Sequence, residues 1–146
     1  SSIGSLVRAE ILGRLGVVES SKQLLASLSS GELQKIMIAA SILRDTPILL
    51  CDEPASHLDP KFEVEFWAII MKLAALGKSV ILVSHDLTTT ARNTDKILAL
   101  KSGQVSFFGL SSAAVAQKIF DELFEIPFTY LDTAERGVIV FPEVSA

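Results

Sequence analysis

The sequence predicts an α/β fold with a mostly parallel sheet flanked by helices, and three observations lead to this prediction. Two runs, PILLCDE at 47–53 and SVILVSH at 79–85, are apolar on both faces, as the central strands of a covered sheet are. A segment whose apolar residues follow helical spacing separates them. Because strands joined through a helix pair in parallel by a right-handed crossover, we expect helices on the faces of this sheet.

Two helices are expected before the first strand. LVRAEILGRL at 6–15 has apolar residues near helical spacing and stops at Gly16. The segment 31–43 repeats apolar residues at intervals of three and four, and Ser29 with Glu32 forms a capping-box pattern at its start. The expected buried stripe consists of Leu33, Ile36, Met37, Ala40 and Leu43.

A longer helix is expected between the two apolar strands. Asp59 supplies an N-cap and Pro60 a first-turn proline, and the helix should run to about Leu76 before Gly77 ends it. Its expected inward residues are Phe66, Ile69, Ile70 and Leu73.

Shorter elements are expected after the second strand. LTTTARNT at 87–94 predicts a short helix, and DKILAL at 95–100 predicts a third strand. KSGQ at 101–104 is typical of a hairpin turn, which would give the sheet an antiparallel edge.

The C-terminal region predicts one more helix and one more strand. Ser111 and Ser112 are expected to cap a helix that runs to about Phe124, and GVIVF at 137–141 is expected to be a closing strand.

Composition limits the classes of protein that the chain can belong to. The 146 residues carry a net charge of −4 with both signs interspersed, so we expect no nucleic-acid partner and no polybasic lipid site. The single cysteine, Cys51, excludes an internal disulfide and favours a reducing compartment. No apolar run reaches the roughly 20 residues that a membrane-spanning helix needs. We therefore expect a cytoplasmic protein without direct membrane insertion.

Polar groups follow the two central strands where each strand ends. In an open parallel sheet, ligands bind beyond the carboxyl ends of the strands. Asp52 and Glu53 follow the first strand, and Ser84 and His85 follow the second, so one crevice could receive all four. Taken singly, a carboxylate there is more often a solvated turn residue and a histidine more often a loop residue. Their joint order favours a functional site.

That order resembles the ATP-binding cassette (ABC) ATPase family. LSSGE at 28–32 resembles the LSGGQ signature, and PILLCDEP at 47–54 resembles the Walker B strand with its adjoining glutamate. SHLD at 56–59 resembles the D-loop, and VSHD at 83–86 resembles the switch-histidine loop. DKILALKSGQVSFFG is similar to the segment after the histidine, so the close resemblance extends from about residue 28 to 109.

The resemblance implies the C-terminal part of a P-loop NTPase-like ABC ATPase. It divides the chain into the end of a helical subdomain with the signature helix, at 1–45, and the C-terminal part of the ATPase core, at 46–146. The implied cofactors are ATP and Mg²⁺. Asp52 would orient a water on Mg²⁺, Glu53 would polarise the attacking water, and His85 would hold the γ-phosphate.

The signature residues would face the ATP of a second subunit. The implied nucleotide-binding residues are Ser29, Ser30, Gly31, Glu32 and Asp59. Ser29 and Gly31 lie at a helix start, where N–H groups and the helix dipole favour an anion. Asp59 would help to link the two subunits. Two positions depart from the family pattern. Ser30 replaces a glycine and crowds the backbone's approach to phosphate, and Glu32 replaces a glutamine, which suits the capping box.

No G-x-x-x-x-G-K-[ST] phosphate loop occurs in the sequence. LGKSV at 76–80 matches only its end, because Lys72 occupies the first glycine position and the segment precedes a strand. In the family the phosphate loop, the adenine-stacking aromatic residue and the glutamine loop all lie upstream of the signature. The chain also begins SSIGS without methionine. We therefore expect the C-terminal half of an ABC ATPase, inactive when alone.

The implied function is that of the ATP-hydrolysing subunit of an ABC transporter, which powers transport by ATP-driven dimerisation. Its partners would be a second ATPase subunit and membrane-spanning permease subunits, which would hold it at the inner face of the cell membrane. DEPASHLDP and LFEIPFTYL resemble importers of iron complexes, siderophores or cobalamin. The alternatives are a chromosome-maintenance or DNA-repair ABC ATPase, and a non-catalytic remnant that only pairs with another chain. Pro54 and the strand-turn-strand ILALKSGQVSFFG favour the transporter.

Overall fold

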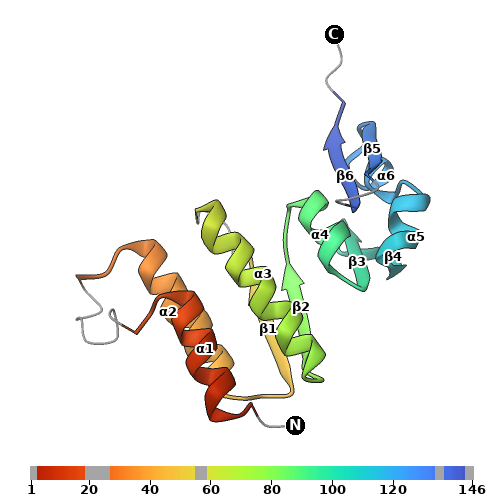
Figure 1. Ribbon diagram of the computed structural model, residues 1–146. Coiled ribbons are helices and arrows are strands. Elements are labelled where there is room, and N and C mark those ends of the chain that lie inside the picture. Colours follow the sequence, from red (N-terminus) through yellow and green to blue (C-terminus); the bar gives the residue numbers. More distant parts are fainter. Residues whose placement is uncertain (1–2, 19–26, 55–58, 134–136, 144–146) are drawn as a thin grey trace. The chain divides into compact units, whose positions relative to one another are not determined.

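The computed structural model describes residues 3–18, 27–54, 59–133 and 137–143. They form two compact units, Ser1–Val83 and Ser84–Ala146 (Figure 1). The first unit contains α1 (Ser5–Leu15), α2 (Ser30–Leu43), β1 (Ile48–Asp52), α3 (Pro60–Ala75) and β2 (Ser79–Val83). The second contains α4 (Leu87–Asn93), β3 (Lys96–Lys101), β4 (Gln104–Leu110), α5 (Ser111–Ala116), α6 (Ile119–Phe124), β5 (Phe128–Thr133) and β6 (Gly137–Pro142).

The first unit is built on the parallel pair β1–β2, as the sequence predicts. The strands pair in register from Ile48 opposite Ser79 to Asp52 opposite Val83, and α3 is the crossover between them. One face of the pair packs against the helices through Leu49, Cys51, Val80 and Leu82. The opposite face, which the sequence predicts to be covered as well, is exposed. Its apolar residues are Ile48, Leu50, Ile81 and Val83.

The ends of α1 and α3 follow the local sequence. Gly16 ends α1 in the left-handed conformation, with φ 65°. Asp59 caps α3 by accepting a hydrogen bond from the Phe62 N–H, and Pro60 begins the helix. The four inward residues expected for α3 are all buried, which confirms its predicted face.

The predicted face of α2 is wrong. Three of the five residues of the expected stripe, Leu33, Met37 and Ala40, are exposed. The buried residues are instead Ile38, Ala39 and Ile42, which pack into the core with α1 and α3. Nearly every residue from 36 to 43 is apolar, so spacing alone defines two equally good stripes.

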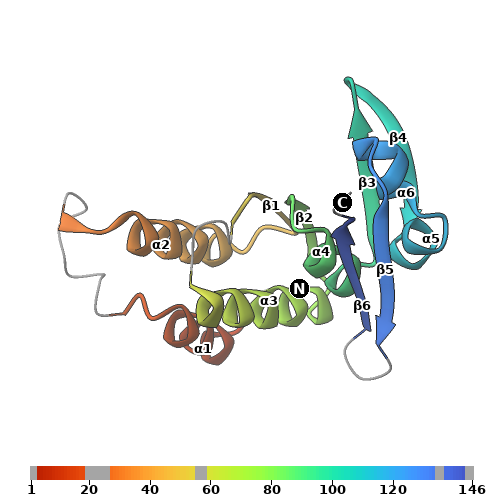
Figure 2. The same cartoon turned by 90° about the horizontal axis from the view of Figure 1, so that it is seen from above.

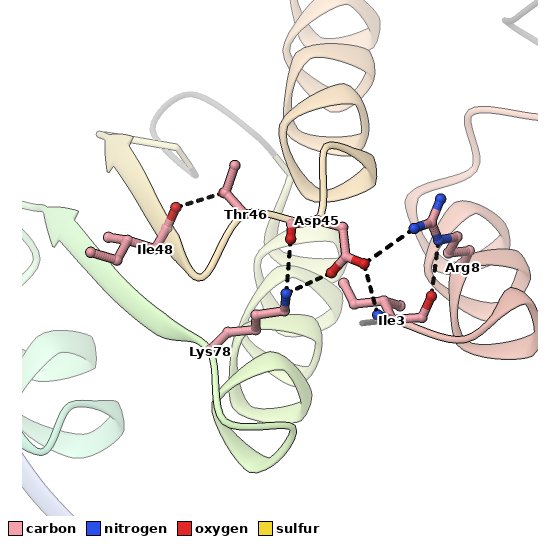
Figure 3. Close-up of polar contacts among 6 residues, drawn as sticks. All are labelled: Ile3, Arg8, Asp45, Thr46, Ile48 and Lys78. Carbon is pink, nitrogen blue, oxygen red and sulfur yellow. Dashed lines mark hydrogen bonds and ion pairs between the residues drawn. The ribbon is translucent and has the colours of Figure 1, made fainter. Parts of the chain in front are cut away.

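The turn between α2 and β1 is held by Asp45 (Figure 3). Its carboxylate accepts hydrogen bonds from the Ile3 N–H at 3.0 Å and from Arg8 at 3.2 Å. It also pairs with Lys78, whose side chain is only 7% exposed and which donates a second hydrogen bond to the Asp45 carbonyl. One acidic side chain therefore joins the start of α1, the end of α2 and the residue before β2.

The second unit is built on two antiparallel pairs, β3–β4 and β5–β6. Figure 2 shows the β3–β4 hairpin beside α5 and α6. Ser102 and Gly103 form its turn with φ values of 51° and 76°, which confirms the hairpin predicted at 101–104. The predicted helix at 87–94 and the predicted strand at 137–141 are confirmed as α4 and β6. Thr88 joins these two elements, because its hydroxyl donates to the Val140 carbonyl and accepts from the Val140 N–H.

The helix expected from Ser111 to about Phe124 is divided. Lys118, with φ 52°, separates α5 from α6. Ser111 does not cap α5, whose N-cap is Leu110. The buried Ser111 hydroxyl donates instead to the Ala91 carbonyl, at 2.7 Å. The sequence does not predict strand β5, Phe128–Thr133.

The helices of the described residues are all too short or too polar to cross a membrane.

Candidate functional site

The acidic pair lies at the carboxyl end of β1, as its sequence position predicts. Asp52 is the last residue of the strand and is exposed. Glu53 follows with φ 44°, a left-handed conformation that is disfavoured for a residue with a side chain. Its N–H donates to the Val83 carbonyl at 3.0 Å, which extends the β1–β2 hydrogen bonding by one residue. The backbone therefore turns at Glu53 while it is still held by β2.

Gln34 on α2 also holds this turn, although it lies outside the signature at 28–32 and the other motifs. Its side-chain amide donates to the carbonyl of Glu53 at 3.3 Å and to the carbonyl of Pro54 at 2.7 Å. Gln34 is partly buried, whereas Pro54 is buried. An uncharged polar side chain early in a largely apolar helix is the only sequence signal that points to this contact.

The signature residues form the N-terminus of α2. Ser29 is the N-cap, and Ser30 and Gly31 are the first two helical residues. The Ser29 hydroxyl donates to the Glu32 carboxylate at 2.6 Å and accepts from the Glu32 N–H at 3.3 Å. The Glu32 carboxylate also accepts from the Ser29 N–H, and the hydrogen bonds from Ser29 lower the pKa of Glu32. The predicted capping box is therefore confirmed.

Asp59 serves as the N-cap of α3 and lies near α2. The hydrogen bond from the Phe62 N–H, together with the charge of Lys35, lowers the pKa of Asp59. The Lys35 ammonium lies 3.8 Å from the Asp59 carboxylate and 4.7 Å from the centre of the Phe62 ring. The remainder of the predicted D-loop, at 56–58, lies outside the described residues.

His85 lies in the second unit, between the end of β2 and α4. Next to it, Asp86 caps α4 by accepting from the Thr89 N–H, and the Asp86 N–H donates to the Ser84 hydroxyl. The exposed His85 thus lies in a short, hydrogen-bonded connection. Its position relative to Asp52 and Glu53, which belong to the first unit, stays a prediction.

The donor set at the end of β1 fits a Mg²⁺ ion that keeps most of its water. Among the described residues, no group of three or more His, Cys, Asp or Glu side chains could hold a metal ion. Asp52 offers one exposed carboxylate. Mg²⁺ retains several waters and is commonly bound through one or two carboxylates together with phosphate oxygens, so a single exposed aspartate is compatible with it.

Comparisons with known proteins agree with the motifs. A family model described as ABC transporter matches residues 7–56. The chain is 31% identical over 115 residues to the petrobactin import ATP-binding protein FpuC of Bacillus anthracis, which covers 78% of this chain and 42% of that protein. It is 31% identical over 125 residues to the vitamin B12 import ATP-binding protein BtuD of Yersinia pestis, which covers 81% of this chain and 49% of that protein.

Solved structures share the fold. A structure described as a metal-chelate type ABC transporter in an inward-facing conformation matches with a TM-score of 0.79 at 23% identity, covering 99% of this chain and 60% of that one. A structure described as the ATP binding subunit of an ABC transporter matches with a TM-score of 0.73 at 23% identity, covering 84% of this chain and 56% of that one. The chain spans about half the length of the curated relatives described above.

Proposed function

Because this chain is homologous to the ATP-binding subunits of ABC transporters, we propose that it forms the C-terminal part of a subunit that binds and hydrolyses ATP to power import. The observation that carries the proposal is the Asp52–Glu53 pair at the carboxyl end of the parallel strand β1. A carboxylate held there by the backbone of β2 lies where ligands of open parallel sheets bind.

The three candidate catalytic side chains have separate roles in this proposal. Glu53 accepts a proton from the attacking water, and Asp52 accepts hydrogen bonds from the water around the metal. His85 donates a hydrogen bond to the γ-phosphate and so orients it. When bound, Mg²⁺ supplies positive charge that offsets the charge of the phosphate oxygens.

The start of α2 and Asp59 act toward a second subunit in this proposal. The first turn of α2, together with its N-cap, is formed by Ser29, Ser30, Gly31 and Glu32. Its backbone N–H groups and the helix dipole favour the binding of a phosphate. Asp59 lies close to this helix because its carboxylate pairs with Lys35 of α2. In this proposal Asp59 also contributes to the contact between the two subunits. The complete protein works as a pair of such subunits, attached to permease subunits at the inner face of the membrane.

We place the cargo among metal complexes and cobalamin-type compounds. The names of three similar proteins, which are 31–33% identical to this chain, refer to the import of petrobactin, vitamin B12 and nickel, which supports this class. Two proteins that are 29% identical are named for the import of phosphonates.

Replacement of Glu53 by glutamine tests the catalytic assignment. In the complete protein, Glu53→Gln removes the proton acceptor and should slow ATP hydrolysis by about 10²–10⁴-fold while ATP still binds. Single-turnover hydrolysis and nucleotide-binding titrations measure the two effects, and Glu122→Gln, at an exposed position of α6, is the matched control. If Glu53→Gln stays folded but loses ATP binding, or hydrolyses ATP at the normal rate, the assignment is wrong.

The isolated chain should hydrolyse ATP poorly. Its sequence contains no G-x-x-x-x-G-K-[ST] loop to cradle the triphosphate, so the candidate catalytic residues have no fixed phosphate to act upon. A steady-state phosphate-release assay on the purified chain, with its Glu53→Gln variant as the control for contaminants, measures this. Mg²⁺-dependent turnover that disappears in the variant would contradict the expectation.

A further inference from the structure

We propose that Gln34 is a positioning residue for hydrolysis, which acts by holding the backbone of Glu53 and Pro54 from helix α2. This inference rests on the proposed function, because it concerns the catalytic role of Glu53. Gln34 belongs to none of the motif positions discussed above, and the geometry of its amide alone assigns the role.

Two elements hold the backbone of Glu53 from opposite sides of the residue. On its N-terminal side, its N–H donates to the Val83 carbonyl of β2 at 3.0 Å. On its C-terminal side, the Gln34 amide donates to its carbonyl at 3.3 Å and to the next carbonyl, that of Pro54, at 2.7 Å. One side chain therefore binds two successive carbonyls, which fixes the direction in which the chain leaves β1.

The conformation of Glu53 makes such support necessary. Its φ of 44° lies in the left-handed region, where the Cβ atom crowds the backbone, so the free turn would favour other conformations. The φ angle also sets the direction of the Cα–Cβ bond. If the two carbonyls are released, the turn relaxes and the Glu53 carboxylate points elsewhere, even though no catalytic atom has been changed.

The contact also connects the two motifs of the first unit. Gln34 lies in the same helix whose N-cap is Ser29, so the signature end of α2 and the turn at Glu53 are joined by one rigid element and two hydrogen bonds. A displacement of α2 would be transmitted to Glu53 through the Gln34 amide.

Substitutions of similar length can separate the donor from the bulk of the side chain. In the complete protein, Gln34→Met keeps the length and removes the N–H donor, whereas Gln34→Lys keeps both a long chain and N–H donors. Gln34→Met should lower kcat about 10- to 100-fold, the loss typical of a slightly misplaced catalytic group, with an unchanged dissociation constant for ATP. Gln34→Lys should retain most of the activity. Ser41→Ala is the control, because Ser41 lies on the same helix and its hydroxyl donates only to the Met37 carbonyl within that helix.

A double substitution tests whether Gln34 acts through Glu53. In a Glu53→Gln background, Gln34→Met should cause no further loss of single-turnover rate, because the group that it positions is already absent. Three results would overturn the proposal: a normal kcat for Gln34→Met, equal losses of kcat for the Met and Lys variants, or a loss of rate by the same factor with and without Glu53→Gln.

Should Gln34→Met fail to fold in a thermal unfolding scan, Gln34→Asn, whose amide is too short to reach both carbonyls, should show the same kcat loss. Failure of the proposed function is distinguishable, since Glu53→Gln alone would then leave hydrolysis intact.

Discussion

The hydroxyl of Ser29 is committed to its own helix. It donates its single proton to the Glu32 carboxylate and accepts from the Glu32 N–H. A hydroxyl has only one proton to donate, so Ser29 can donate to a phosphate oxygen only after it releases Glu32. The proposed role of Ser29 toward a partner's ATP and its observed role as a cap therefore compete for the same hydrogen atom.

Ser29→Ala separates these roles in the complete protein. As a cap alone, Ser29 would contribute about 1 kcal/mol to the free energy of unfolding, and its loss would leave hydrolysis by the folded protein unchanged. As a ligand of the partner's ATP, it should also stabilise the nucleotide-bound dimer, so the variant should dimerise more weakly in ATP. Sedimentation with and without ATP measures this, together with thermal unfolding.

Mixed dimers assign the Ser29 effect to one subunit or the other. In a dimer in which one subunit carries Glu53→Gln, only the site with the intact Glu53 is active. We expect this site to lose activity when the Glu53→Gln subunit also carries Ser29→Ala. We expect no such loss when Ser29→Ala lies instead in the subunit that supplies the intact Glu53. If activity depends only on the number of intact Glu53 residues, Ser29 is a helix cap and nothing more.

The contribution of Asp59 to the stability of the chain, as the N-cap of helix α3, is expected to depend on pH. Its pKa is lowered by the hydrogen bond from the Phe62 N–H and by the charge of Lys35, so the folded value lies below the unfolded value. The stabilisation from this carboxylate is therefore present above the unfolded pKa, near pH 4, and is lost as the pH falls through the lower folded pKa. In Asp59→Asn the amide oxygen still caps the helix but does not titrate.

Urea unfolding between pH 2 and pH 7 measures this contribution. The difference in unfolding free energy between the original chain and Asp59→Asn should be constant above about pH 5 and shrink at lower pH. A difference that stays constant over the whole range would show that the ionisation of Asp59 is not linked to folding.

At the scale of elements, the local sequence predicts the ends and the buried face of a helix when its apolar residues form a single stripe. The ends of α3 follow from Asp59 and Pro60 at its start and Gly77 after it, and its buried face follows from a single helical stripe. Helix α2 has apolar residues almost all round, so its buried face depends on the packing of α1 and α3, which spacing does not contain. Its capping box is nevertheless predictable, because the hydrogen bonds that form it join only Ser29 and Glu32, which lie three residues apart.

Elements that depend on distant partners were the ones mispredicted. Ser111 has the chemistry of a helix cap, but its hydroxyl donates to the Ala91 carbonyl twenty residues earlier. Strand β5 is defined by its pairing with β6, and its sequence, FTYLDT, has no regular alternation of its own. In the candidate site, the positions of Asp52 and Glu53 at the end of β1 were predictable from the apolar run. The support from Gln34 was not, because nineteen residues of sequence separate it from Glu53.

The turn of the β3–β4 hairpin is suboptimal at its first position. Ser102 and Gly103 both have positive φ, as a two-residue turn of type I′ requires, and asparagine followed by glycine is the preferred pair. Ser102→Asn should therefore stabilise the chain by a few tenths of a kcal/mol, whereas Gly103→Ala should destabilise it by about 1 kcal/mol. Chemical denaturation of both variants checks the opposite signs. If Gly103→Ala is as stable as the original chain, the turn does not require a positive φ at this position.

At the scale of the whole chain, the exposed face of the β1–β2 pair is an open apolar surface. Ile48, Leu50, Ile81 and Val83 are 53–71% exposed and lie on one face of two adjacent strands. Single exposed apolar residues are common on proteins, but a contiguous group on a sheet face is typical of a surface that is covered in the functional state. In the isolated chain, this face should drive association.

Leu50→Lys tests that expectation because it places a charge in the middle of the face. The matched control is Val64→Lys, since Val64 on α3 is 70% exposed and Leu50 is 71% exposed. Light scattering of the isolated chain should show a mass that rises with concentration, because each copy gains by removing apolar surface from water. Leu50→Lys should reduce this rise and Val64→Lys should not, since only the former changes the sheet face. A mass that stays at one chain over the whole concentration range, or equal effects of the two substitutions, would show that the exposed strands do not mediate association.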